Sequence, residues 1–185
     1  MLNGISLGIM TVIVLLLLGF ILTLFINAFL IPLLKTPKEV ISEIIDIMDL
    51  EKGDHLADLG SGDGRLLLKA HGSSGCKCTG YDISPMMLII AQTKKILQFP
   101  LSKDFTFEAE DIFKVDLEKF TKVYCYLDEK SLEILKPKLE EFVKSGGEVY
   151  SYKYNIKNIN VNNKKETTRE EKIILKDGNP LYIYR

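Results

Sequence analysis

The first 34 residues of this 185-residue chain contain no Asp, Glu, Lys or Arg, and Lys35 is the first charged side chain. The whole chain carries 24 basic and 25 acidic residues, which gives a formal net charge of −1. It therefore lacks the surplus of basic residues with which nucleic-acid-binding proteins neutralise phosphates. We expect no nucleic-acid partner.

Cysteine and histidine are also scarce. The three cysteines, Cys76, Cys78 and Cys125, are odd in number, and the C-x-C pair has no second pair that would complete a zinc site. His55 and His71 are isolated from each other and from the cysteines. These absences argue against a metal site and a disulfide framework, and they predict core thiols in a reducing compartment.

The uncharged leader is almost entirely apolar, and from residue 5 it reads ISLGIMTVIVLLLLGFILTLFINAFLIPLL. About 20 such residues are enough to cross a bilayer. A cleaved signal peptide fits less well, because the leader has no positive start, too long an apolar run and no small-x-small cleavage site. The sequence therefore predicts a transmembrane anchor at residues 1–34, in contact with the lipid bilayer.

The orientation of such an anchor depends on the charges that flank it. Lys35 and Lys38 follow the apolar run, and no charged side chain precedes it. By the positive-inside rule, we expect a single-pass membrane protein with its body, residues 35–185, in the cytoplasm.

The body alternates short apolar runs with amphipathic segments. Period-two patterns predict strands at 55–60, 77–84, 104–111, 122–128 and 147–154, and helical spacing predicts helices at 36–50, 65–70, 85–99 and 129–143. Strands that are separated by single helices form a parallel sheet with helices on its faces. A D-G turn between the apolar runs 172–176 and 180–185 predicts a hairpin. The predicted fold is α/β: a Rossmann-like, doubly wound, mostly parallel seven-stranded sheet with a C-terminal antiparallel hairpin.

Two segments of the body allow more than one interpretation. Thr36 and Pro37 look like an N-cap and a helix-opening proline, whereas the family resemblance described below implies that they cover a ligand. The Asn/Lys-rich segment 155–172 is either a solvated loop or a contact region for anionic headgroups or a substrate.

The sequence ADLGSGDGR places Gly60, Gly62 and Gly64 between the first predicted strand and its helix. Glycines in such a turn let the backbone approach a ligand. Arg65 stands where the dinucleotide fingerprint requires a glycine, and Asp58 would lie unfavourably close to a pyrophosphate. The spacing favours a small cationic nucleoside over NAD.

Two further acids lie at the ends of the next two predicted strands. Asp82, in GYDIS, could accept hydrogen bonds from both ribose hydroxyls, and Asp111, in AEDIF, could accept one from the exocyclic amine of adenine, with Ile112 and Phe113 covering the ring. Each acid alone could instead be a helix cap, but ligands bind at the carboxyl ends of such strands, where all three acids lie. The candidate ligand-binding residues are Asp58, Gly60, Ser61, Gly62, Gly64, Asp82, Ile83, Asp111 and Ile112.

These motifs resemble those of a known superfamily. ADLGSGDG, GYDIS and AEDIF are similar to the cofactor motifs of class I S-adenosylmethionine-dependent methyltransferases. The order of apolar leader, PLLKTPKEV, DLGSGDGRLLLKA, GYDISP, EDIF and VYCYL more narrowly resembles small archaeal and membrane-anchored mitochondrial seven-β-strand protein lysine methyltransferases. The resemblance implies S-adenosyl-L-methionine as cofactor of a methyltransferase domain at 35–185, and lysine in a membrane or membrane-proximal protein as substrate. Many relatives have glutamate where this chain has Asp82, and the segment after Tyr154 matches poorly.

A lysine acceptor must lose its proton before it attacks the methyl group, and an apolar, aromatic channel favours the neutral amine. Tyr126 and Tyr154, at the ends of the fourth and fifth predicted strands, could form such a channel and steer the cation. Asp128 could orient the amine or take its proton through water. Both tyrosines could instead be core residues, and Asp128 could simply begin a helix.

Two other functions fit the same motifs. One is methylation of a lipophilic small molecule such as a quinone or a lipid, for which an apolar cavity would be expected. The other is a non-catalytic module that binds the cofactor and tethers a partner.

Overall fold

The computed structural model describes residues 4–30, 36–157, 162–163, 166–167 and 170–185. The chain divides into two compact units, Met1–Leu33 and Leu34–Arg185. The predictions that concern Lys35, and those that concern side chains between 158 and 169, lie outside what the structure describes.

Helix α1 (Gly4–Leu30) forms the described part of the first unit. Its described side chains, residues 8–23, are all exposed. Among the described residues, no helix is both long and apolar enough to cross a membrane. This finding overturns the predicted single-pass membrane localisation with a cytoplasmic body, and the transmembrane helix predicted within residues 1–34 is unsupported.

A seven-stranded sheet with the order β3-β2-β1-β4-β5-β9-β8 forms the centre of the second unit. Its strands are β1 (His55–Leu59), β2 (Lys77–Tyr81), β3 (Phe105–Glu108), β4 (Lys122–Cys125), β5 (Glu148–Tyr152), β8 (Glu170–Ile174) and β9 (Pro180–Tyr184). Strands β1 to β5 are parallel, and β9 pairs antiparallel with β5 and β8. The predicted Rossmann-like sheet with a C-terminal hairpin is confirmed. A separate two-stranded ladder, β6 (Asn162–Asn163) with β7 (Glu166–Thr167), lies in the segment for which a loop was one prediction.

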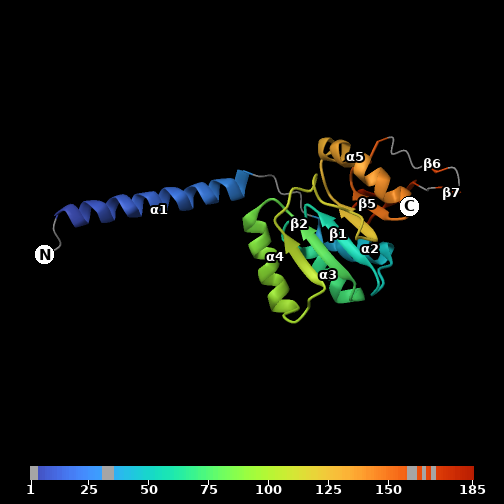
Figure 1. Cartoon of the computed structure of the whole chain (residues 1–185), viewed down its shortest axis with the longest axis horizontal. Coiled ribbons are helices and arrows are strands. Elements are labelled where there is room, and N and C mark those ends of the chain that lie inside the picture. Colours follow the sequence, from blue (N-terminus) through green and yellow to red (C-terminus); the bar gives the residue numbers. More distant parts are fainter. Residues whose placement is uncertain (1–3, 31–35, 158–161, 164–165, 168–169) are drawn as a thin grey trace. The chain divides into compact units, whose positions relative to one another are not determined.

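Helices cover both faces of the sheet (Figure 1). On one side lie α2 (Lys38–Met48), α3 (Arg65–Ser74) and α4 (Pro85–Gln98), and on the other lies α5 (Glu129–Lys144). Alternate residues of a strand point to opposite faces, so Tyr124 of β4 packs in the core with α2 and α3, whereas Val123 and Cys125 pack with α5. This alternation produces two hydrophobic cores, one on each face.

The start of α2 differs from the prediction. The helix begins at Lys38, so Pro37 occupies the N-cap position and makes no side-chain capping hydrogen bond. The Thr36 hydroxyl lies 2.7 Å from the hydroxyl of Tyr124, and both side chains are buried. The predicted Thr36 cap is therefore wrong, because a partner 88 residues away in the sequence takes up its hydroxyl.

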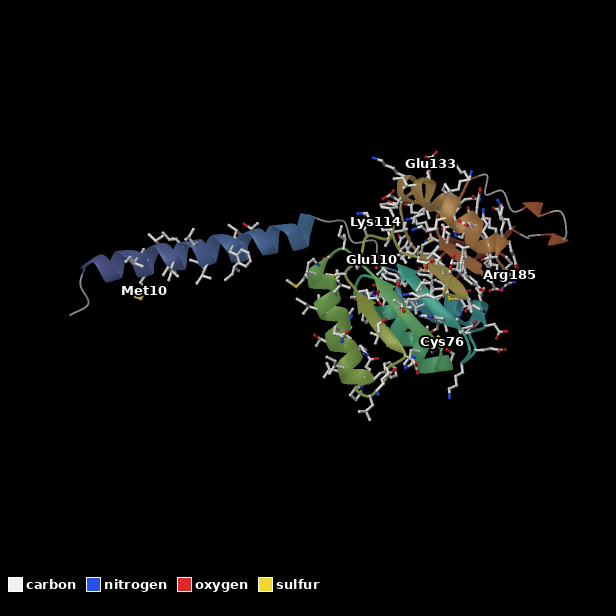
Figure 2. The ribbon with its side chains drawn as sticks, in the orientation of Figure 1. Met10, Cys76, Glu110, Lys114, Glu133 and Arg185 are labelled. Carbon is white, nitrogen blue, oxygen red and sulfur yellow. The ribbon has the colours of Figure 1, made fainter. Side chains whose placement is uncertain are left out.

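The parallel strands bring their carboxyl ends to one edge of the sheet. Figure 2 shows Cys76, which precedes β2, and Glu110, which follows β3, toward opposite ends of these strands. The edge marked by Glu110 is the one that carries the glycine turn after β1 and the acids after β2 and β3.

Candidate functional site

The backbone conformation of the turn between β1 and α3 depends on its glycines. Gly60, Gly62 and Gly64 have φ values of +87°, +53° and +73°, which side chains rarely allow. The backbone N–H groups of Gly60 and Ser61 donate to the Tyr81 carbonyl at 2.9 and 2.8 Å, so the turn is tied to the end of β2. This arrangement places the turn beside the acid that follows β2.

The glycines of this turn differ in what surrounds them. A Cβ on Gly64 would lie 2.3 Å from Cζ of Phe107, whereas a Cβ on Gly62 would have no atom within 4 Å. Gly64 is therefore needed for packing, and Gly62 leaves open space against its backbone.

Replacing Gly64 with alanine is expected to destabilise the chain by about 2–4 kcal/mol, because positive φ costs about 1–2 kcal/mol and the clash with Phe107 adds to it. The matched variant Gly62→Ala has similar strain without the clash and should lose less. Urea unfolding measures both. Equal losses would show that Phe107 moves aside without cost.

Asp58 is the most unusual group at this edge. It lies in β1, is 4% exposed, and has no hydrogen-bond partner for its carboxylate among the described residues. Burial raises its pKa to about 8, and the negative charges of Asp82 and Asp63 add to the effect. A buried carboxylate without a partner is costly unless a cation or a donor pairs with it.

Asp82 braces the glycine turn. One of its carboxylate oxygens accepts from the Gly62 N–H and the other from the Ser84 N–H, both at 2.8 Å. Ser84 is the N-cap of α4, so this carboxylate joins the turn to the start of that helix. Each oxygen retains a lone pair for a further donor. The neighbouring Ile83 side chain is 79% exposed at the same edge.

Asp111 lies farther from the protein interior. It accepts from the Phe113 N–H at 3.1 Å, and Lys114 lies 3.8 Å from its carboxylate. Its side chain is 36% exposed, and Ile112 beside it is partly buried. The structure therefore places an accessible acid and an apolar side chain together after β3.

An ion-pair group that the sequence analysis did not single out lies under the glycine turn. Asp63 accepts from Arg65 at 2.7 and 2.8 Å and from Lys94 at 2.8 Å. Burial alone would raise the Asp63 pKa, but these two cations hold the pKa well below its usual range. Arg65 and Asp63 are two residues apart in the motif, but Lys94 comes from α4, 31 residues away.

Ser61 adds a second buried polar group without a partner. Its hydroxyl is buried and has no hydrogen-bond partner in the part of the chain that the structure describes. Together with the Asp58 carboxylate, it gives this edge two polar groups that a bound ligand would satisfy.

The three candidate acceptor-site residues lie after β4 and β5. The Tyr126 and Tyr154 rings stack with centroids 6.4 Å apart, and Tyr152 lies edge-on to Tyr126 at 4.7 Å. Asp128 is the N-cap of α5 and accepts from the Ser131 N–H at 2.8 Å, as its capping interpretation predicted. Tyr152 was not singled out, because a tyrosine inside a strand has no pattern that separates it from other core residues.

The site combines a glycine turn after β1, a buried acid before that turn and an acid after β2 that accepts hydrogen bonds from the turn. On a sheet of this strand order, these features define the fold of class I S-adenosylmethionine-dependent methyltransferases. Residues 58–163 match the family model described as the ANTKMT methyltransferase domain. The chain belongs to this family. The predicted enzyme class and the resemblance from which it came are confirmed.

Two relatives agree with this assignment, and a solved structure shares the fold. A protein-lysine N-methyltransferase of Saccharolobus islandicus (strain REY15A) is 28% identical over 83% of this chain and 92% of its own length. The adenine nucleotide translocase lysine N-methyltransferase of Mus musculus is 27% identical over 60% of this chain, which spans about half of that protein (49%). The solved RNA methyltransferase of Salinibacter ruber, in complex with S-adenosyl-L-homocysteine, shares the fold with a TM-score of 0.66 and 24% identity over 82% of this chain and 92% of its own.

The cofactor of this enzyme is S-adenosylmethionine, as predicted, and the site fits it. The molecule carries a sulfonium and an ammonium group, and the unpaired Asp58 carboxylate is a buried acceptor for positive charge. The open space at Gly62 and the unpaired Ser61 hydroxyl lie in the adjoining turn.

Proposed function

We propose that this chain transfers methyl groups from S-adenosylmethionine to lysine side chains of a protein, and that residues 35–185 form the catalytic domain. The observation that carries the proposal is the buried Asp58 carboxylate, which has no partner among the described residues and stands directly before the glycine turn. Because the pKa of Asp58 is raised to about 8, this side chain is mostly the neutral acid at pH 7 in the ligand-free chain. A cationic cofactor favours its ionised form and pairs with it, whereas a neutral or anionic nucleotide provides no such partner.

The proposed cofactor contacts follow the edge of the sheet from β1 to β3. Asp58 accepts from the cationic end of the cofactor, Asp82 from the ribose hydroxyls and Asp111 from the adenine amine. Ile83 and Ile112 cover the ring with apolar surface. The backbone of Gly60, Ser61, Gly62 and Gly64 lies against the cofactor.

The acceptor side lies after β4 and β5. A bound cofactor would supply a methyl group on a positively charged sulfur. The neutral lysine amine attacks the methyl carbon in line, so that the N–C bond forms as the S–C bond breaks and the neutral thioether leaves. The stacked Tyr126 and Tyr154 rings provide aromatic faces that bind the lysine side chain and exclude water, which favours the neutral amine. We propose that Asp128 acts on the amine through water, while its direct bond to Ser131 keeps the start of α5 in place.

The choice of lysine in a protein rests on the relatives. Both curated relatives described above carry lysine N-methyltransferase in their names, and the archaeal one matches nearly its full length. The sequence alone left a lipophilic small molecule open as acceptor, and the alignment with these two proteins favours a protein lysine over it.

The test is incubation of the full chain with methyl-labelled S-adenosylmethionine and a protein extract, followed by amino-acid analysis of the labelled product. We expect label in methyl-lysine. Label in a lipid fraction or in nucleic acid would contradict the proposal.

The acceptor site is tested by a pair of variants at Tyr154. Tyr154→Ala removes the aromatic face and should lower kcat/KM for the protein substrate by about 10- to 100-fold. Tyr154→Phe retains the ring and should keep most of the activity. S-adenosylmethionine affinity, measured by calorimetry, should be unchanged in both variants. Equal activity of the alanine and phenylalanine variants would remove Tyr154 from the acceptor site.

A further inference from the structure

A cavity of about 600 Å³ opens between the helices that cover one face of the sheet. Its wall includes Lys38 of α2, Arg65 and Lys69 of α3, and Lys94 of α4. It shares Arg65 with the ion-pair group under the glycine turn, so one end of it adjoins the cofactor motif.

All charged side chains that line this cavity are basic. Its lining includes these four basic residues and no Asp or Glu, although the chain as a whole has more acidic than basic residues. Lys38 and Lys69 are exposed and form no ion pair with the residues that the structure describes. A concave surface with one sign of charge concentrates ligands of the opposite sign.

The protein already places one carboxylate beside this wall. Asp63 lies between Arg65 and Lys94, with contacts of 2.7 and 2.8 Å. These two cations therefore sit at a spacing that a single carboxylate can bridge. Lys38 and Lys69 lack such a partner, and they would pair with carboxylates supplied from outside.

The cavity also has apolar walls. Ile41, Leu68 and Phe99 contribute to its lining, between the charged side chains. A phosphate ion would fill little of the volume and would leave these apolar groups without contacts. A polypeptide segment that alternates acidic and apolar side chains satisfies both the cations and the apolar wall.

We propose that this cavity, which we call the basic groove, is a docking site for an acidic segment of the protein substrate. The proposal rests on the proposed function, because it takes the partner to be the protein that is methylated. Docking beside the glycine turn holds the substrate near the cofactor edge while its lysine enters between the tyrosines after β4 and β5.

The test uses the full chain and a short fluorescein-labelled peptide of alternating Glu and Leu, with fluorescence anisotropy as the readout. The double variant K38E/K69E reverses both unpaired charges and should weaken peptide binding by roughly tenfold or more at low salt. The matched variant K52E/K103E makes the same change in net charge at exposed lysines outside the groove, and it should bind like the unmodified chain. Equal loss in both double variants would overturn the proposal, because net charge alone would explain it.

A second measurement identifies the class of ligand. Vesicles of phosphatidylcholine and phosphatidylserine, and inorganic phosphate, are titrated against the same three proteins. If K38E/K69E lost binding to either of these while its affinity for the peptide was unchanged, the groove would be a phosphate or headgroup site and the proposal would be overturned.

Methylation of the protein substrate provides the final readout. In K38E/K69E, the KM for the protein substrate should rise while kcat for a short lysine peptide without acidic residues stays unchanged. If neither substrate is methylated by the unmodified chain, the proposed function fails while the peptide-binding result still stands. If both are methylated with an unchanged KM in the variant, the docking proposal fails alone.

Discussion

Replacing Asp58 with asparagine is expected to weaken S-adenosylmethionine binding by about 100-fold or more, while making the ligand-free chain more stable at alkaline pH. The side chain keeps its size but loses the charge that would pair with the cofactor. A lost buried charge pair costs about 3–5 kcal/mol, which is enough for this change in affinity. Isothermal calorimetry measures it directly.

The pH dependence of stability provides an independent test of the same residue. The Asp58 pKa is about 8 in the folded chain and about 3.9 in the unfolded chain, so the folded chain binds more protons between these values. Stability should therefore fall as pH rises from about 4 to about 8 and level off above that. Asp58→Asn removes this dependence and should gain stability on the order of a few kcal/mol above pH 8.

The control for this experiment is Asp46→Asn, at an exposed position of α2. It should change neither cofactor affinity nor the pH profile of urea unfolding. An Asp58→Asn variant with unchanged cofactor affinity would refute the role proposed for this carboxylate. A profile that still falls between pH 4 and 8 in that variant would show that another group titrates there.

Replacing Asp82 with alanine is the second large change, and it should lower cofactor affinity by about 100-fold. Two effects combine. The ribose acceptor is lost, and the Gly62 and Ser84 N–H groups lose the carboxylate that accepts from both. Unfolding in urea should also show a loss of about 1–3 kcal/mol.

A series at this position separates the two effects. Asp82→Asn retains one acceptor oxygen. It should keep part of the hydrogen bonding to the Gly62 and Ser84 N–H groups and part of the affinity for S-adenosylmethionine. Glu110→Ala removes a negative charge from an exposed position at the same edge of the sheet. Glu110 does not connect the glycine turn to α4, so this variant should leave the affinity for S-adenosylmethionine unchanged. If Glu110→Ala lost as much affinity as Asp82→Ala, the general negative charge of this edge would be the cause.

The order of strands and helices, the glycine turn, the acid in β1 and the acids after β2 and β3 could all be predicted from the sequence. These features depend on residues close together in the chain: alternating apolar residues for the strands, a run of glycines for the turn, and Asp-Gly-Asn for the β8–β9 hairpin. A parallel α/β arrangement then brings the carboxyl ends of the strands to one edge by geometry alone.

The partners of individual side chains could not be predicted in this way. Thr36 bonds to Tyr124 rather than capping α2, and Lys94 joins Asp63 across 31 residues. The apolar leader was predicted to span a membrane, but no helix among the described residues is both long and apolar enough to do so.

By itself, the sequence determined the fold class, the superfamily and the position of the cofactor edge, because local periodicity and short motifs encode them. The tertiary structure alone decided which polar groups lack partners and which cations gather in one cavity. Packing of the sheet buries Asp58 away from any hydrogen-bond partner among the described residues, and the basic groove exists because three helices bring their lysines and Arg65 together. Burial and proximity of this kind depend on contacts between distant parts of the chain, and a local sequence pattern does not predict such contacts.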